Sequence, residues 1–152
     1  MQRIGIITCS NITNDFACAS FFCLADSHAG KGTFARYAEG GGVNVVGIIS
    51  CSGCPTLMAP EKIIRRVRTL VASGVDAIHF SNCMEQFCPF KNKYESFLKA
   101  EFPDMEFVAG THEDPPEEVG EIFGRLVHDA LCQRRTSMAD LLETLNQHEP
   151  GE

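Results

Sequence analysis

Short apolar runs and amphipathic stretches alternate along this chain. Four apolar runs have the length and side-chain character of β-strands. They span residues 3–9, 43–50, 76–81 and 105–111. Each of them is followed by residues with signals of helix formation, so the chain repeats a strand and helix unit.

The predicted helices begin close to prolines, which are favoured in the first turn of a helix. The clearest begins near Pro60, and others begin after Pro89 and near Pro116. A last short helix is predicted to open at Ser137. The segment 11–39 is less regular, and we expect a loop with two short helical pieces there.

Strands that alternate with helices of this length require crossover connections, which produce a parallel sheet covered on both faces. We therefore predict an α/β fold with a four-stranded, mostly parallel sheet in three layers, of flavodoxin-like or Rossmann-like type. Residues 1–135 are predicted to form this single domain. Residues 136–152 are predicted to form a C-terminal helical appendage.

Composition narrows the possible functions. The chain of 152 residues has a formal net charge of −7 and a pI near 5.2, which argues against a nucleic-acid partner. No apolar run reaches membrane-spanning length, so we expect no membrane partner and a cytoplasmic location. Eight cysteines are many for a cytoplasmic chain, where thiols stay reduced. A metal or redox role is therefore favoured over a disulfide framework.

The cysteines concentrate after strand ends. In a parallel sheet the carboxyl ends of the strands meet at one edge, where ligands usually bind. Seven of the eight cysteines and one histidine follow strands in this way, whereas cysteines used as small apolar residues would scatter through strands and helix faces. The candidate metal ligands are Cys9, Cys18, Cys23, Cys51, Cys54, Cys83, Cys88 and His112.

Two of these cysteines directly precede prolines. Cys54 and Cys88 are therefore predicted to lie at helix N-termini, with Cys83 in the loop before the second of these helices. The positive end of a helix dipole lowers the pKa of a thiol and favours the thiolate. Gly53 allows a tight turn between the two sulfurs of the central Cys-Ser-Gly-Cys motif.

Several short motifs together resemble the CGGC domain family. They are IGIITC at the N-terminus, SCSGCP at the centre, AIHFSNC with CPF shortly after it, and a THE turn. The resemblance runs from about Ile4 to His112, and Ser52 replaces the first glycine of the naming motif. Members are small prokaryotic proteins whose cysteines and histidines suggest zinc binding. The resemblance implies the same eight ligands and supplies no reaction.

Three of the other histidines and Cys132 have ordinary explanations. His79 lies inside a predicted strand and is expected to be a hydrogen-bonded core histidine. Cys132, His128 and His148 belong to the C-terminal helices, away from the cysteine-rich edge, and we exclude them. The glycines 40–42 precede a strand and predict a turn, since a phosphate-binding loop would precede a helix.

The first functional hypothesis is a metal-binding protein that uses thiolates to hold zinc or an iron–sulfur cluster. Seven thiols and an imidazole exceed what one tetrahedral zinc uses. Either two centres share the edge, or one centre leaves spare thiols for chemistry. A cluster would make the protein an electron carrier or a redox sensor with a protein redox partner. Sulfur ligands suit both metals, so the sequence leaves the choice open.

The alternative is a metal-free thiol enzyme for disulfide exchange or sulfur transfer. Cys51 would be the nucleophile and Cys54 the resolving thiol, as in other Cys-x-x-Cys motifs. This hypothesis ranks second because it leaves five neighbouring thiols without a role. A pure interaction module ranks third, since it does not explain why cysteines gather at one edge.

Overall fold

A computed structural model of the chain describes residues 1–54, 57–114 and 116–132. Strands and helices alternate through them as the apolar pattern predicts. In chain order the elements are β1 Gln2–Thr8, α1 Ser10–Asn14, α2 Phe21–Ala29, the 3₁₀ helix η1 Gly32–Gly40, β2 Val43–Ser50, α3 Ala59–Ala72, β3 Ala77–Phe80, α4 Asn82–Phe87, α5 Lys91–Glu101, β4 Glu106–Ala109 and α6 Glu117–Cys132.

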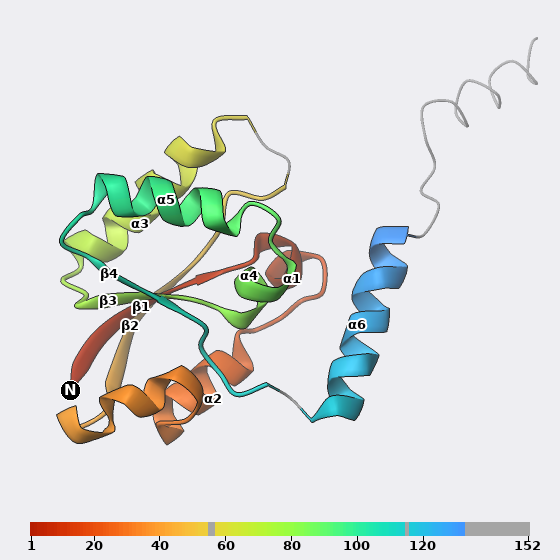
Figure 1. Ribbon diagram of the computed structural model, residues 1–152, viewed down its shortest axis with the longest axis horizontal. Coiled ribbons are helices and arrows are strands. Elements are labelled where there is room, and N and C mark those ends of the chain that lie inside the picture. The colour runs from red at the N-terminus through yellow and green to blue at the C-terminus, as the bar shows by residue number, and fades with distance from the viewer. Residues whose placement is uncertain (55–56, 115, 133–152) are drawn as a thin grey trace, which may run out of the picture. The chain divides into compact units, whose positions relative to one another are not determined.

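The four strands form one sheet in the order β2-β1-β3-β4, and every pairing is parallel. Helices α3 and α5 cover one face of the sheet, whereas α2 and η1 cover the other (Figure 1). This arrangement confirms the predicted three-layer α/β fold. The pairing of β1 with β2 shifts register between Ile4 and Gly5.

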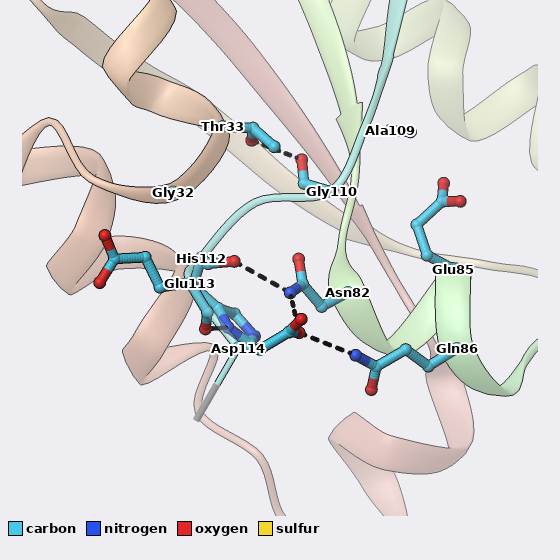
Figure 2. Close-up of a pocket in the computed structure, with 10 residues that line it drawn as sticks. All are labelled: Gly32, Thr33, Asn82, Glu85, Gln86, Ala109, Gly110, His112, Glu113 and Asp114. Carbon is cyan, nitrogen blue, oxygen red and sulfur yellow. Dashed lines mark hydrogen bonds between the residues drawn. The ribbon is translucent and has the colours of Figure 1, made fainter. Parts of the chain in front are cut away.

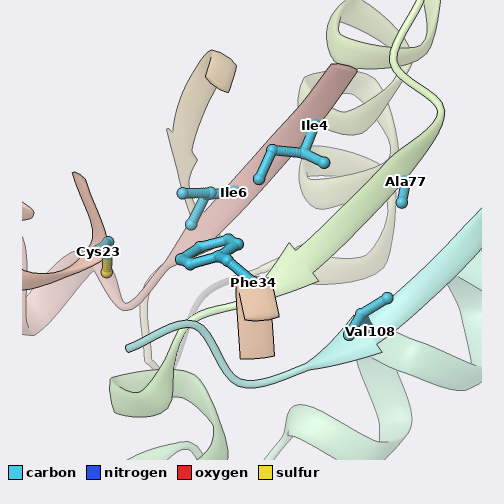
Figure 3. Packing of buried hydrophobic residues seen from close by; sticks show 6 residues of the cluster. All are labelled: Ile4, Ile6, Cys23, Phe34, Ala77 and Val108. Atoms are coloured by element: carbon cyan, nitrogen blue, oxygen red, sulfur yellow. The ribbon is translucent and has the colours of Figure 1, made fainter. Parts of the chain in front are cut away.

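One half of the core lies between the sheet and the helices α2 and η1 (Figure 3). Alternate residues of β1 point to this face because side chains of a strand alternate between its two sides. The buried members of this cluster are Ile4, Ile6, Cys23, Phe34, Ala77 and Val108.

The opposite face holds α3 unusually close to the sheet. Gly5 of β1 and Gly47 of β2 are paired, and Leu70 of α3 packs over both. A β-carbon at Gly5 would lie 2.7 Å from Leu70 Cδ1, and one at Gly47 would lie 2.9 Å from Leu70 Cδ2. The two glycines therefore make a flat area that the leucine side chain fills.

Burial differs between the central and the edge strands. From Ile4 onward β1 is buried, and β3 is buried throughout. The edge strand β2 is only half-buried, except for the exposed Asn44. The expectation that apolar strands are covered on both sides is therefore correct for the centre of the sheet, where each strand has two neighbours.

Helix α4 was not predicted, and its presence corrects two expectations. Cys83 lies inside α4 and is not in a loop, and Cys88 is the C-cap of α4. The next helix, α5, begins only at Lys91. Cys54 also lies away from a helix start, because α3 begins at Ala59 after Met58, which has a left-handed backbone with φ of 54°. Neither cysteine is therefore at a helix N-terminus.

The chain divides into two compact units, Met1–Asp114 and Pro115–Glu152. The whole sheet belongs to the first unit, and α6 belongs to the second. The predicted domain boundary after residue 135 and the predicted helix at Ser137 lie outside the described residues. Within the described residues, no helix is both long enough and apolar enough to cross a membrane.

Candidate thiol site

The candidate site lies where β1 and β3 are neighbours in the sheet. The chain leaves β1 toward β2 on one side and later returns to β3 on the other, so the strand order reverses between these two strands. Such topological switch points are the usual ligand sites of open parallel sheets. Cys9 follows β1, and its backbone N–H donates to Cys83 Sγ, in α4 beyond β3, at 3.3 Å.

Cys51 follows β2 and is only 1% exposed. Its sulfur accepts a hydrogen bond from Ser10 N–H at 3.4 Å, and Ser10 Oγ lies 3.7 Å away in a second hydrogen bond. A hydrogen bond from the Cys9 thiol lowers the pKa of Cys51 most, and the N–H groups of Ser10 and Gly53 lower it further. Burial opposes these effects, yet the pKa of Cys51 falls to about 5. Cys51 is therefore a thiolate at neutral pH.

Cys9 is the protonated partner of this thiolate. Its hydrogen bond to Cys51 and its burial both raise the pKa of Cys9 far above the ordinary range. The two sulfurs consequently hold one proton between them at neutral pH, with Cys9 as donor and Cys51 as acceptor.

Cys54 and Cys88 form a second interacting pair, in which each side chain affects the pKa of the other. Burial, followed by the charge on Cys51, raises the pKa of Cys54. Burial raises the pKa of Cys88 to about 11. The prediction that these two thiols are ionised is therefore wrong, because neither lies at a helix N-terminus whose dipole could stabilise a thiolate.

These two pairs bring together thiols from three separate segments of the chain. Both thiols of the second pair also interact electrostatically with Cys51. We call the four residues the switch-point group: Cys9, Cys51, Cys54 and Cys88.

Three further thiols lie beside this group. Burial raises the pKa of Cys23, and repulsion from Cys83 and Cys18 adds to the rise. Burial likewise raises the pKa of Cys83, and repulsion from Cys18 adds to this rise. Cys23 Sγ lies 3.4 Å from Thr111 Oγ1, and Cys83 Sγ lies 3.0 Å from Ser81 Oγ. We call Cys18, Cys23 and Cys83 the flanking group.

His112, the eighth predicted ligand, lines an open cavity of about 430 Å³ (Figure 2). Its Nδ1 donates to the carbonyl oxygen of Glu113 at 2.7 Å. The Asn82 side chain donates to the His112 carbonyl at 2.9 Å and to Asp114 at 3.4 Å, which ties the turn after β4 to α4. His112 is thus held by its own turn and by α4, and its hydrogen bonds do not involve the cysteines.

The donor chemistry of the site fits a soft metal, since thiolates are the preferred ligands of zinc and of iron–sulfur clusters. The arrangement does not yet form a coordination sphere. Among the residues that the structure describes, no three histidine, cysteine or carboxylate side chains are grouped so as to hold a metal ion. The thiols instead interact in pairs, Cys9 with Cys51 and Cys54 with Cys88.

Two polar residues outside the predicted ligand set hold the central motif. Arg66 of α3 donates to the carbonyl oxygen of Ser50 at 2.8 Å and also to that of Cys51. Ser52 Oγ donates to the carbonyl of Ala59 at 2.8 Å. In the sequence Arg66 is one of several basic residues of the helix that begins near Pro60, and no local pattern marks it for this role.

His79 is a core histidine, as predicted. It is fully buried, and its Nε2 lies 2.9 Å from Tyr37 Oη, while its Nδ1 donates to the Gly110 carbonyl at 2.9 Å. Burial lowers the pKa of His79, so the ring is neutral at physiological pH. These contacts join β3 to η1 and to the turn after β4.

Comparison with known proteins yields one strong match. The family model for the CGGC domain matches residues 3–112, which include all of the sheet but its first residue, Gln2, and all eight predicted ligands. Among curated proteins, none matches the chain. The C-terminal catalytic domain of ISC1926 TnpA, an IS607-like serine recombinase, is similar at 13% identity and a TM-score of 0.39, with 95% of this chain and 97% of that chain covered. That likeness is too low to support an argument.

Proposed function

The chain belongs to the CGGC domain family, and on this basis we propose that its switch-point thiols bind zinc or an iron–sulfur cluster. One observation carries the proposal. Three other thiols, Cys9, Cys54 and Cys88, come from three segments of the chain and each interacts with the Cys51 thiolate at the topological switch point. Four thiolates are the ligand number that both zinc and common iron–sulfur clusters use.

Binding would change the protonation of this group. Cys51 is already ionised, whereas Cys9, Cys54 and Cys88 hold protons in the free protein. Ligation would release these protons and replace the two thiol pairs, so affinity should rise with pH. Bound metal would supply either a closed structural site or an electron-transfer centre, depending on its identity.

Elemental analysis with an absorption spectrum tests the proposal, on tag-free protein purified without oxygen. We expect about one zinc per chain without colour, or iron with sulfide and a broad visible band. A double variant, Cys51→Ser with Cys54→Ser, should lose the metal. Cys132→Ser is the matched control and should retain it. Unchanged metal content in the double variant would refute the assignment.

A second candidate function follows from the lowered pKa of Cys51. As a metal-free thiol enzyme, the protein would use the Cys51 thiolate to attack a disulfide and release one thiolate of the substrate. Cys54 would then attack Cys51 Sγ, releasing the second substrate thiol and leaving a Cys51–Cys54 disulfide. Thiolate character at neutral pH favours such attack.

The two candidate functions can be distinguished with the same purified sample. Metal-free protein whose Cys51 reacts with iodoacetamide at pH 6 would favour exchange chemistry, because ordinary thiols are protonated at that pH. Metal-loaded protein whose Cys51 reacts only after chelation would favour the metal site.

A further inference from the structure

A cavity of about 320 Å³ lies between the start of α3 and the start of α5. None of the eight predicted ligands lines it, so it is distinct from the switch-point and flanking groups. Its volume is at the lower end of the range for small-molecule sites. Its apolar walls include Met58, Ala59, Pro60 and Phe90.

A buried tyrosine brings a polar group to this apolar cavity. Tyr94 lines the cavity and is only 2% exposed. None of the residues that the structure describes forms a hydrogen bond with its hydroxyl group. Burial is the main reason that the pKa of Tyr94 rises to about 12, so the hydroxyl keeps its proton and is a donor. Buried hydroxyl groups are normally hydrogen-bonded, which makes a ligand with an acceptor oxygen a fitting partner for Tyr94.

Lys93 of α5 supplies a positive charge at the same cavity. Among the described residues no carboxylate forms an ion pair with Lys93, whose ammonium group lies 5.9 Å from the centre of the Phe97 ring. The other lysines of α5 differ, because Lys91 and Lys99 both form ion pairs with Glu95. Lys93 is therefore the lysine of this helix whose charge is left for an anion.

The start of α3 favours an anion as well. Met58, its N-cap residue, makes no side-chain hydrogen bond to the first turn, where backbone N–H groups have no partner within a helix. Met58 and Ala59 line the cavity, so the positive end of the dipole of this 14-residue helix lies beside it. Glu61 in the same turn carries an opposing charge, but it does not line the cavity.

We propose that this cavity binds a small aromatic carboxylate, with the ring of the ligand against Met58 and Phe90 and its carboxylate at Lys93 and Tyr94. The apolar walls remove the ring from water, whereas the ammonium and hydroxyl groups fix the position of the carboxylate. A ring suits these walls, because the rings of Phe90 and Tyr94 already lie 6.3 Å apart, a spacing at which aromatic rings attract one another.

The test is a titration of the reduced full chain with phenylacetate, followed by calorimetry and by two-dimensional amide NMR spectra. We expect saturable binding with a dissociation constant on the order of 1 mM, and shift changes at the residues that line the cavity. Phenylacetamide is neutral and has the same shape, so it should bind at least about fivefold more weakly. Acetate has no ring and should bind at least about tenfold more weakly.

Variants of the two polar groups test their separate roles. Lys93→Gln should weaken phenylacetate binding about two- to fivefold and leave phenylacetamide binding unchanged, a split that a merely structural role would not produce. Lys99→Gln is the matched control on the same helix and should bind phenylacetate as the wild type does, because Lys99 is paired with Glu95. Tyr94→Phe should weaken phenylacetate binding about three- to tenfold.

Circular dichroism checks that Tyr94→Phe is folded, and the exposed change Lys93→Gln carries the test if it is not. Four results would overturn the proposal: no saturable binding of phenylacetate, equal affinity for phenylacetate and phenylacetamide, equal losses in Lys93→Gln and Lys99→Gln, or shift changes confined to residues outside the cavity. None of them depends on metal binding or thiol exchange, because none of the described residues that line the cavity is a cysteine.

Discussion

The switch-point and flanking groups place the same residue type at the same sheet edge with opposite consequences. Cys51 is buried and surrounded by hydrogen-bond donors, two of them backbone N–H groups, and its pKa falls to about 5. Cys23 is also buried, yet desolvation outweighs its hydrogen bond with Thr111, and its pKa rises. The comparison teaches that burial alone does not determine thiol chemistry. The number of donors aimed at the sulfur decides whether the thiolate is stable.

The largest expected effect comes from removing the sulfur that these donors share. Cys51→Ala leaves the N–H groups of Ser10 and Gly53 without an acceptor in a buried place, and it should lower the free energy of unfolding by about 1–3 kcal/mol. Cys18→Ala, at an exposed position, should change it by about 0.5 kcal/mol or less. Urea unfolding measures both. Equal losses would remove the distinction between the two groups.

The second prediction concerns the proton that Cys9 and Cys51 share. Cys9→Ala removes the largest stabilising hydrogen bond of the thiolate, so the pKa of Cys51 should rise by about one to two units. Thiolate absorbance at 240 nm during a pH titration reports this change. Cys23→Ala, in the flanking group, should leave the pKa of Cys51 unchanged at about 5.

The low pKa of Cys51 also makes the free energy of unfolding depend on pH. The folded-state pKa of Cys51, about 5, lies below the ordinary value of about 8.5. The contribution of the Cys51 thiolate to the free energy of unfolding is therefore complete above about pH 8.5. It is lost as the pH falls through about 5. Cys51→Ser should flatten this part of the curve of unfolding free energy against pH. A curve with the same slope in both proteins would contradict the assigned thiolate.

A smaller effect is expected from the arginine that holds the end of β2. Arg66→Met removes the hydrogen bonds to the carbonyls of Ser50 and Cys51 and should cost about 1–2 kcal/mol. Alkylation of Cys51 should then accelerate while that of Cys18 does not. Arg68→Met is the matched control on the same helix. Arg68 forms an exposed ion pair with Glu101, so the change should be close to zero.

The smallest effect should follow from restoring the glycine of the family motif. Ser52→Gly removes the hydrogen bond to the Ala59 carbonyl and loosens the turn, at a cost of about 0.5–1 kcal/mol. Hydrogen exchange at the start of α3 should increase, and the flanking group should be unaffected. Slower exchange would show that Ser52 strains the turn instead of closing it.

Most of the fold could be predicted because periodicity and turn residues are local properties. The four strands lie within one or two residues of the predicted ranges, and the prolines correctly indicated where α3, α5 and α6 begin. Prediction failed at Cys83 and Cys88, where the helix α4 is only six residues long and has no apolar stripe of its own. The helix after Pro89 does form, but Cys88 ends α4 and does not begin α5, which starts only at Lys91.

The sequence by itself determined that cysteines follow every strand but the last, and hence that they gather at one edge of a parallel sheet. That conclusion needs only strand order along the chain and the common direction of parallel strands. The tertiary structure decided which thiols meet and which one is ionised. Besides the neighbouring Gly53 N–H, the donors to Cys51 are Ser10 and Cys9, about forty residues earlier in the chain. Such contacts depend on how separate loops pack, and no local pattern of residues encodes them.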